Sequence, residues 1–288
     1  MLPLQSTIGV TAVLEVHNVK TRILAALVLV PVLLAVLFFA PPFLFSIVVG
    51  IVCAIGAYEL LNGTRMVKNF RLVCYAMLLA LCVPIWCQCG MDADIACVGL
   101  FLFTILIFAE ILLSHGKLSF HEACICYFGG LLLPYMLSSL VRLLGDGSGR
   151  AAILIPFILA YMADTGAYFI GCAFGRHKLA PNISPKKSVE GLFGGIFFAV
   201  LGMIIYCLVM NKAFHTNVNY LYAITYGIVG ALIGTFGDLS FSAVKRQAGI
   251  KDYGNLIPGH GGILDRFDSV IFVAPLTEIL LRILPVLE

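Results

Sequence analysis

The chain has 288 residues, of which 61% are hydrophobic and only 11% are charged, whereas roughly 25% of the residues in an ordinary soluble domain are charged. Its mean hydropathy is +1.05 and its formal net charge is +3. Too little polar surface is available to cover a soluble globule, and apolar residues are too abundant for a disordered chain. No heptad repeat, basic arm or nucleic-acid-binding motif is present. The composition therefore predicts an all-α polytopic membrane protein with no nucleic-acid partner.

A helix needs roughly 20 mainly apolar residues to cross a bilayer. In chain order, runs of this kind occur at 23–40, 43–61, 72–90, 95–113, 123–144, 151–171, 192–210, 221–240 and 269–287. The first run is too long for a signal peptide, and Pro41 and Pro42 turn the chain straight into the second run, so we expect an uncleaved anchor. Most of the ten cysteines lie within apolar runs, and we expect them to pack as small apolar residues.

The basic residues predict how these spans are oriented, because cytoplasmic loops are enriched in Lys and Arg. With the N-terminus in the cytoplasm, 14 of the 18 basic residues fall in cytoplasmic segments. The remaining four are Arg142, Arg150, Lys212 and Arg282. We therefore expect about nine transmembrane helices, with a cytoplasmic N-terminus and the C-terminus on the opposite side.

Polar residues are concentrated in the second half of the chain. We accordingly divide it into an N-terminal transmembrane region, 1–144, with spans one to five, and a catalytic region, 145–288, with spans six to nine. The catalytic region includes two long cytoplasmic loops, 172–191 and 241–268, which are rich in Gly, Pro and charged residues. We expect the function to reside in these loops and in the span ends beside them.

The first polar cluster lies near the cytoplasmic end of span six. Asp164 and Tyr168 are four residues apart, so they share one face of a helix. An ionisable residue inside a span is costly and therefore points to function. The alternative is a buried carboxylate that only contacts a neighbouring helix.

The second cluster is Ser184-Pro185-Lys186-Lys187. A serine followed by proline predicts a helix with Ser184 as its N-cap and Pro185 in its first turn. Unpaired amides at a helix start, flanked by two lysines, would bind an anion. A basic loop that only fixes the orientation of the protein accounts for the lysines equally well.

The third cluster begins in span eight. Asp238, Ser242 and Lys245 lie at positions i, i+4 and i+7, which places them on one stripe of a helix, with Arg246 beside them. The glycine-rich segment 258–262 follows and permits a tight turn and a close approach of the backbone to a ligand.

The same cluster ends at the start of span nine with Asp265, Arg266 and Asp268. Three carboxylates that converge with several cations suit a divalent metal ion and phosphate groups, and hard oxygen ligands favour Mg²⁺. A solvated charged loop, the plainer alternative, does not explain why Asp238 lies in an apolar helix.

The third cluster as a whole resembles the signature of the phosphatidate cytidylyltransferases, also called CDP-diacylglycerol synthases. The matching pattern is Ser242-x2-Lys245-Arg246-x4-Lys251-Asp252-x-Gly254-x-Leu256-x-Pro258-Gly259-His260-Gly261-Gly262-x2-Asp265-Arg266-x-Asp268. The two upstream clusters resemble elements of the same family. The first 140 residues match this family only as a series of spans.

The resemblance implies that CTP and phosphatidate react to give CDP-diacylglycerol and pyrophosphate, with Mg²⁺. Both reactants are anions, so cations must neutralise them and hold the lipid phosphate in line with the α-phosphorus of CTP. A phosphate monoester has a second pKa of about 6, so it is already mostly a dianion at neutral pH and needs no general base.

This reaction assigns roles to the clustered residues. We expect Asp238 and Asp265 to bind the metal, with Asp268 as a third ligand or as a partner of the other two, and we expect Lys245 and Arg246 to complete the catalytic set. His260 is expected to be a turn residue that hydrogen-bonds phosphate or backbone. The full set of substrate-binding candidates is Asp164, Tyr168, Ser184, Lys186, Lys187, Ser242, Lys251, His260, Gly261, Gly262 and Arg266.

Other functions share some of these features. A cytidylyltransferase acting on ether lipids and a CTP-dependent polyprenol kinase would also need CTP, a metal ion and an interfacial acceptor, but the long motif favours the phosphatidate enzyme. A secondary transporter would also carry intramembrane acids and broken helices, but it should show two related halves. The polar residues of this chain crowd into one half.

The lipid substrate and the charge distribution together predict a multi-pass protein of the bacterial inner membrane, with the active site facing the cytoplasm. The resemblance implies a homodimer, and Gly230-x3-Gly234 in span eight permits close helix contact, either between chains or within one chain. The sequence does not distinguish Mg²⁺ alone from Mg²⁺ with a second, monovalent cation.

Overall fold

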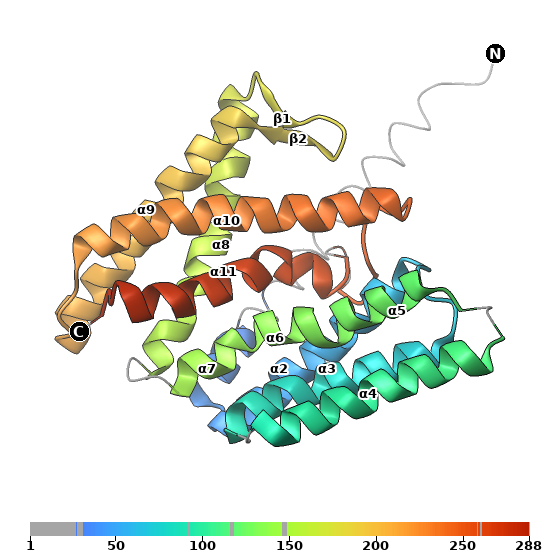
Figure 1. The fold of residues 1–288 in the computed structure, drawn as a ribbon. Helices are drawn as coiled ribbons and strands as arrows, with labels where there is room; N and C mark the ends of the chain where they lie inside the picture. Colours follow the sequence, from blue (N-terminus) through green and yellow to red (C-terminus); the bar gives the residue numbers. More distant parts are fainter. Residues whose placement is uncertain are drawn as a thin grey trace, which may run out of the picture.

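A computed structural model describes residues 27, 31–90, 93–115, 118–145, 149–257, 259 and 261–287. The described chain is built almost wholly from helices (Figure 1). Residues 31–39 are helical and precede the labelled elements. These are α2 Pro42–Tyr58, η1 Glu59–Gly63, α3 Phe70–Cys89, α4 Ala93–Leu113, α5 Phe120–Tyr127, η2 Phe128–Leu132, α6 Leu133–Leu137, α7 Ser139–Gly145, α8 Gly149–Phe174, β1 Lys178–Ala180, β2 Ser184–Ser188, α9 Val189–Phe214, α10 Tyr220–Gln247 and α11 Leu264–Ile283.

Seven helical segments of the described chain are long and apolar enough to cross a bilayer. They are Pro42–Gly63, Phe70–Cys89, Ala93–Leu113, Phe120–Gly145, Gly149–Phe174, Val189–Phe214 and Tyr220–Gln247. These segments coincide with the second to eighth predicted spans, so the prediction of an all-α polytopic membrane protein is confirmed. The count of nine and the orientation stay predictions.

The two terminal spans differ from the other seven. Of the predicted span 23–40, only Leu27 and the residues from 31 onward lie within the described part of the chain. The ninth predicted span, 269–287, corresponds to α11, which begins earlier, at Leu264. Helix α11 is less apolar because its 20 residues include Asp265, Arg266, Asp268, Glu278 and Arg282.

Helix α11 lies in the interior of the protein. It packs against α10 and α8 on one side and against α6 and α7 on the other. In Figure 1 it runs between α10 and the layer formed by α2, α3, α6 and α7. Val270, Ile271, Val273 and Ala274 are all buried. The three acidic residues of α11, Asp265, Asp268 and Glu278, are also buried, and surrounding protein lowers the cost of placing them at membrane depth.

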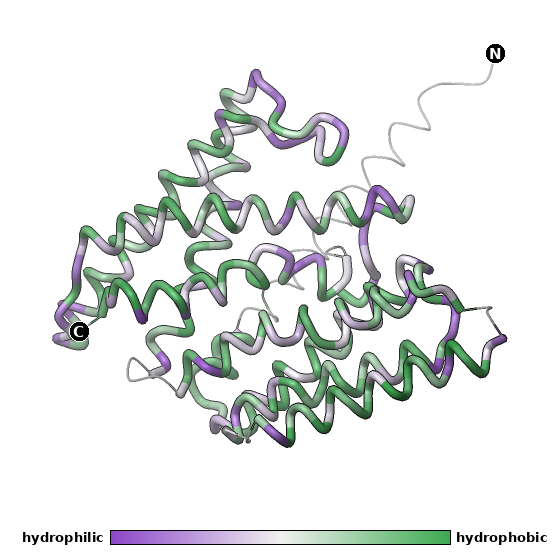
Figure 2. The backbone as a smooth tube through the Cα atoms, in the orientation of Figure 1, coloured by the Kyte–Doolittle hydropathy of each residue, from purple (hydrophilic) through white to green (hydrophobic). Residues whose placement is uncertain are grey.

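Polar residues gather away from the middle of the helices. Figure 2 shows hydrophilic colouring on the β1–β2 hairpin, at the end of α10 and at the start of α11, whereas the helix centres are mainly hydrophobic. The hairpin is antiparallel and pairs Lys178 with Ser188 and Ala180 with Ser184. It joins α8 to α9 and extends beyond them (Figure 1).

The glycine stripe predicted on span eight packs within the chain. A Cβ atom added at Gly227 would lie 2.5 Å from the Cα of Val200 in α9, and one at Gly230 would lie 2.8 Å from Leu159 Cδ1 in α8. The stripe therefore serves close helix contacts inside one chain and gives no support to a homodimer.

Candidate active site

The most deeply buried ion pair of the predicted site joins α10 to the start of α11. Lys245 Nζ donates to Asp265 Oδ1 at 2.8 Å, and the side chains of the two residues are only 10% and 2% exposed. The other oxygen, Asp265 Oδ2, accepts the backbone N–H groups of Tyr253 at 2.9 Å and Gly262 at 3.0 Å. Asp265 thus connects the loop between α10 and α11 to Lys245, and both of its carboxylate oxygens accept hydrogen bonds.

A second ion pair joins α10 to the hairpin. Lys187, in β2, contacts Asp238 Oδ2, and both side chains are partly exposed. The hydroxyl of Ser242 donates to Asp238 Oδ1 at 3.4 Å, one helical turn further along α10. The predicted helical stripe of Asp238, Ser242 and Lys245 is confirmed, because all three lie on α10 and the first two are in contact.

Two more carboxylates interact electrostatically with Asp238. Asp164, in α8, interacts with the charges of Asp238, Lys187 and Arg266. Asp268, in α11, interacts with Asp238, Asp164 and Lys245. Within the described residues, neither Asp164 nor Asp268 forms an ion pair. The site therefore combines paired and unpaired carboxylates from three helices.

The close approach of α10 to α11 depends on a glycine next to Asp238. A Cβ atom added at Gly237 would lie 2.9 Å from the carbonyl oxygen of Asp268 and 2.8 Å from the ring of Phe272. Only a residue without a side chain fits there, and this contact brings Asp238 and Asp268 together.

A cavity of about 250 Å³ opens beside these carboxylates. Its lining includes most of the first two predicted clusters, namely Asp164, Tyr168, Ser184, Lys186 and Lys187, together with Thr235 of α10. Asp164 and Tyr168 do share one face of α8, as predicted from their spacing. The lining combines two lysines, hydroxyl groups and one carboxylate, a set of groups that suits a phosphorylated ligand.

The predicted helix start at Ser184 is wrong. Residues Ser184–Ser188 form strand β2, and α9 begins at Val189 with Ser188 as its N-cap, whose side chain accepts the N–H of Gly191 at 3.1 Å. Lys186 and Lys187 consequently lie on a strand and not beside free helix amides. Of the two, Lys186 is exposed, whereas Lys187 is half-buried against Asp238.

The remaining predicted cations have different surroundings. Arg246 donates from Nε to the carbonyl oxygen of Ile183 at 3.2 Å and from Nη1 to that of Ile250 at 3.0 Å, so it connects α10 to the hairpin and to the following loop. Arg266 and Lys251 are exposed.

The glycine-rich segment is only partly described, and His260 lies outside the described residues. Gly261 has a φ of +88°, which favours glycine. A Cβ atom at Gly261 would lie 2.9 Å from Asp265 Oδ2. This glycine therefore allows the loop to close tightly over Asp265.

Sequence reasoning missed two residues of this site. Glu59, from the N-terminal half, accepts the backbone N–H groups of Ile263 and Leu264 at the start of α11. Tyr253 is buried, contacts Asp265 through its backbone, and donates its hydroxyl to the carbonyl oxygen of Phe241 at 3.0 Å. Burial raises the pKa of the Tyr253 hydroxyl far above its usual value, so it remains a neutral donor.

The signal for Glu59 was present in the sequence. It is a carboxylate at the end of the predicted apolar span 43–61, and the argument applied to Asp164 holds for it equally. Tyr253 gave no comparable signal, because a tyrosine in a polar loop is unremarkable until its burial is known.

Carboxylate oxygens are the natural ligands for Mg²⁺, but the described residues contain no preformed group of three His, Cys, Asp or Glu side chains that could hold a metal ion. Asp265 is committed to Lys245 and two amides, and Asp238 is committed to Lys187 and Ser242. Asp268 accepts the N–H of its neighbour Ser269 at 2.8 Å. Any metal ion would therefore share oxygens with these partners or replace them.

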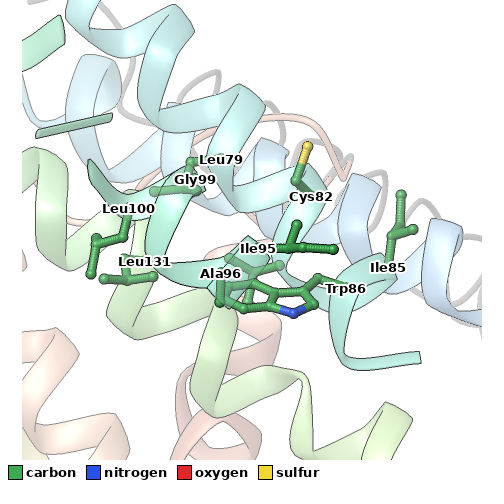
Figure 3. A pocket seen from close by; sticks show the side chains of 10 residues that line it. Leu79, Cys82, Ile85, Trp86, Ile95, Ala96, Gly99, Leu100 and Leu131 are labelled. Carbon is green, nitrogen blue, oxygen red and sulfur yellow. The ribbon is translucent and has the colours of Figure 1, made fainter. Parts of the chain in front are cut away.

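A separate cavity of about 300 Å³ lies between α3, α4 and η2. Figure 3 shows Leu79, Trp86, Ile95 and Leu100 among the apolar side chains that line it. None of the predicted site residues lines this cavity. Its lining offers no charged group for a phosphate, so it is not the candidate active site.

Comparison with known proteins finds relatives that match almost the whole chain. The cytidylyltransferase family matches residues 20–284 of the chain. A phosphatidate cytidylyltransferase of Staphylococcus epidermidis is 36% identical over 272 residues, which cover 91% of this chain and 96% of the relative. The phosphatidate cytidylyltransferases of Staphylococcus haemolyticus and Staphylococcus aureus are each 34% identical over 273 residues, with the same coverage.

Proposed function

The chain belongs to the cytidylyltransferase family, and from this premise we propose that it transfers the cytidylyl group of CTP to phosphatidate, giving CDP-diacylglycerol and pyrophosphate. The relatives that match nearly their whole length carry the name phosphatidate cytidylyltransferase. The observation that carries the proposal is geometric: Lys187 lines one cavity with Asp164 and Lys186, and it also pairs with Asp238. Gly237, next to Asp238, packs closely against the backbone of Asp268. Acids beside cations at the edge of a membrane bundle suit a reaction between two anionic phosphates.

The surroundings of the cavity suit a lipid acceptor. Tyr168, which lines the cavity, is 66% exposed, and its neighbours Phe169 and Phe174 on α8 are also largely exposed. On a transmembrane helix, such apolar side chains face lipid. A phosphate headgroup could therefore enter the cavity while the acyl chains stay in the bilayer.

We further propose that Asp238 and Asp268 would hold Mg²⁺, with Asp265, which also pairs with Lys245, as a further carboxylate. The donor chemistry fits, since all three residues offer carboxylate oxygens. Buried carboxylates without an ion pair are costly, and a divalent cation would offset that cost at Asp268. When bound, Mg²⁺ would neutralise charge on the triphosphate and on the leaving pyrophosphate.

The residues of the chain would hold the two phosphates for in-line attack. Lys186, Lys187 and Ser184 would bind phosphate in the cavity. The exposed Lys251 in the loop and the exposed Arg266 in the first turn of α11 would bind the triphosphate. The buried ammonium group of Lys245, which Asp265 holds in place, would contribute positive charge to the site. The lipid phosphate is already ionised near neutral pH, so it attacks the α-phosphorus without a general base. Arg246 would act by connecting the hairpin and the loop to α10.

We propose that the protein lies in a bacterial plasma membrane with this site facing the cytoplasm. The bacterial relatives and the 14 basic residues in the predicted cytoplasmic segments support this location. Nine spans, the division at residues 144 and 145, and a homodimer belong to the same proposal. The homodimer rests on family resemblance alone.

The reaction is tested with CTP labelled at the α- or the γ-phosphorus. Purified protein in mixed micelles with phosphatidate and Mg²⁺ should transfer the α-label to lipid and release one pyrophosphate for each lipid product. It should leave the γ-label in pyrophosphate, because the bond that breaks lies between the α- and β-phosphates.

The same assay, repeated with a polyprenol or an archaeal-type ether lipid in place of phosphatidate, separates the alternatives. Transfer of the γ-label to a polyprenol would identify a CTP-dependent kinase and overturn the proposal. Transfer of the α-label to an archaeal-type ether lipid, with none to phosphatidate, would keep the chemistry and change the substrate. CTP consumption that produces no labelled lipid would contradict cytidylyl transfer altogether.

A further inference from the structure

A buried carboxylate from the first half of the chain contacts the start of α11, the helix that carries Asp265 and Asp268. Glu59 is the first residue of η1, the π-helical turn that follows α2, and it is 5% exposed. Its Oε1 accepts the backbone N–H of Ile263 at 3.0 Å, and its Oε2 accepts that of Leu264 at 2.8 Å. The two partners lie more than 200 residues away along the chain, at the start of α11.

Helix α11 needs such a partner. The first backbone N–H groups of a helix have no acceptor within the helix itself. The residue at the cap position, Ile263, makes no side-chain capping bond. Glu59 therefore supplies the cap from another element, and its negative charge lies at the positive end of the helix dipole. The turn that it holds carries Asp265, Arg266 and Asp268.

The loop before α11 is also shaped around this carboxylate. A Cβ atom added at Gly254 would lie 2.7 Å from Glu59 Oε1, and one at Gly262 would lie 2.5 Å from Oε2. Both glycines belong to the long motif, and Gly262 lies in the segment 258–262 that was expected to approach a ligand closely. In the structure, these two positions make room for Glu59.

The π-helical turn adds a further contact. A Cβ atom at Gly63, the last residue of η1, would lie 2.4 Å from the carbonyl oxygen of Tyr253. Both ends of η1 therefore press against the loop that precedes α11. Single π-turns inside α-helices occur frequently at functional sites. This one places the Glu59 carboxylate against the backbone at the start of α11.

We infer that Glu59 is a positioning residue for cytidylyl transfer, through which the N-terminal spans complete the active site. It does not touch the cavity lined by Lys186 and Lys187. It acts by fixing the start of α11, and so the places of Asp265 and Asp268 relative to Asp238. This inference rests on the proposed function for its catalytic part, whereas its structural part can be tested without turnover.

The first test is Glu59→Gln, which keeps the side-chain volume and removes the charge and one of the two acceptors. Hydrogen–deuterium exchange of the amides in 262–268 should become about tenfold or more faster, because a hydrogen bond to a charged group is lost. In turnover assays, kcat should fall by about a hundredfold, the loss expected when reacting groups shift by about 1 Å. The KM for phosphatidate should stay within a few-fold of the wild-type value, because the lysines of the cavity are unchanged.

Glu122→Gln is the matched control. Glu122 is also a buried carboxylate near a helix start, and it accepts the backbone N–H groups of Ser119 at 2.9 Å and Lys68 at 3.2 Å. It contacts no residue of the site. Its variant should lose thermal stability but keep the wild-type kcat per folded molecule, with unchanged exchange in 262–268.

Each outcome decides the inference. Wild-type exchange in 262–268 in folded Glu59→Gln overturns it, and so does a loss of kcat that Glu122→Gln reproduces. If Glu59→Gln does not fold, Glu59→Asp takes its place: faster exchange in 262–268 with reduced kcat and unchanged KM supports the inference, and wild-type values overturn it. A wild-type protein that forms no CDP-diacylglycerol contradicts the proposed function, while the exchange data still decide whether Glu59 fixes the start of α11.

Discussion

The two adjacent lysines of β2 face different surroundings, and this difference assigns them unequal roles. Lys187 pairs with Asp238 at the edge of the cavity, whereas Lys186 is exposed. Lys187→Ala should lower kcat/KM by about tenfold to hundredfold, the value of one charge-assisted contact. Lys186→Ala should have a smaller effect. The measurement is a titration of CTP and phosphatidate in mixed micelles for each variant.

Equal losses in the two lysine variants would contradict this ranking, because among the described residues only Lys187 of the two has an ion-pair partner in the site. Wild-type kcat and KM values in both variants would favour the simpler alternative, in which the two lysines only fix the orientation of the protein in the membrane.

The Lys245–Asp265 pair should contribute to stability as well as to catalysis. Asp265→Asn leaves the buried ammonium of Lys245 without its counter-charge, and breaking a buried pair in this way costs about 3–5 kcal/mol. We expect a clear fall in the thermal midpoint of the detergent-solubilised protein, together with loss of turnover. The comparison is Arg71→Ala, which breaks a pair whose arginine is 72% exposed and should cost no more than about 1 kcal/mol. A wild-type midpoint for Asp265→Asn would show that the pair is not formed.

At the scale of elements, the site depends on how closely α10 and α11 approach each other. Gly237→Ala places a methyl group 2.9 Å from the carbonyl oxygen of Asp268, so the helices must separate locally and Asp238 must move away from Asp268. A displacement near 1 Å should reduce kcat by about a hundredfold. The measurement is kcat per folded molecule.

The control is Gly99→Ala in α4, where an added Cβ atom meets no atom within 4 Å. Alanine is a better helix former than glycine by about 1 kcal/mol, so this variant should be neutral or slightly more stable and fully active. A Gly237→Ala variant as active as Gly99→Ala would show that the close contact is not needed for catalysis.

Seven spans and the stripe on α10 could be predicted because they depend on local properties, namely the length of an apolar run and the 3.6-residue period. The hairpin could not, since Ser184-Pro185 satisfies the local rule for a helix start. The choice of Ser188 as N-cap depends on β2 pairing with β1 and reaching Asp238 on α10. The start of α11 was misplaced for a similar reason, because its charged first turn is stabilised by Lys245 and Glu59 from other helices.

At the scale of the whole molecule, the chain folds as two helical groups around α11. Glu59 holds one end of α11. Near its other end, Arg142 of α7 donates from Nε to both oxygens of Glu278, at 3.0 and 2.9 Å. The N-terminal spans, which match the long motif nowhere, therefore support the catalytic helix at two places. This arrangement depends on residues far apart in sequence, and for that reason no local pattern predicted it.

The orientation of the whole bundle is tested by labelling single cysteines from each side of the membrane. Once the ten native cysteines are replaced, Asn255→Cys in the α10–α11 loop should react only from the cytoplasmic side, and Asn217→Cys in the α9–α10 loop only from the opposite side. Both positions are exposed, and both avoid the glycines that enclose Glu59. Reversed labelling would overturn the orientation and the direct access of cytoplasmic CTP.

The most direct test of the proposed site is the Mg²⁺ dependence of CDP-diacylglycerol formation by the wild type and by Asp268→Asn, each corrected for the folded fraction. Asp268 is buried and lies beside Asp238, and no ion pair with another described residue accounts for its charge. We predict that the wild type turns over with Mg²⁺ and stops when the metal ion is chelated, and that folded Asp268→Asn shows no turnover at any Mg²⁺ concentration. Wild-type turnover by Asp268→Asn, or unchanged wild-type turnover after chelation, would contradict a metal-dependent site at these carboxylates.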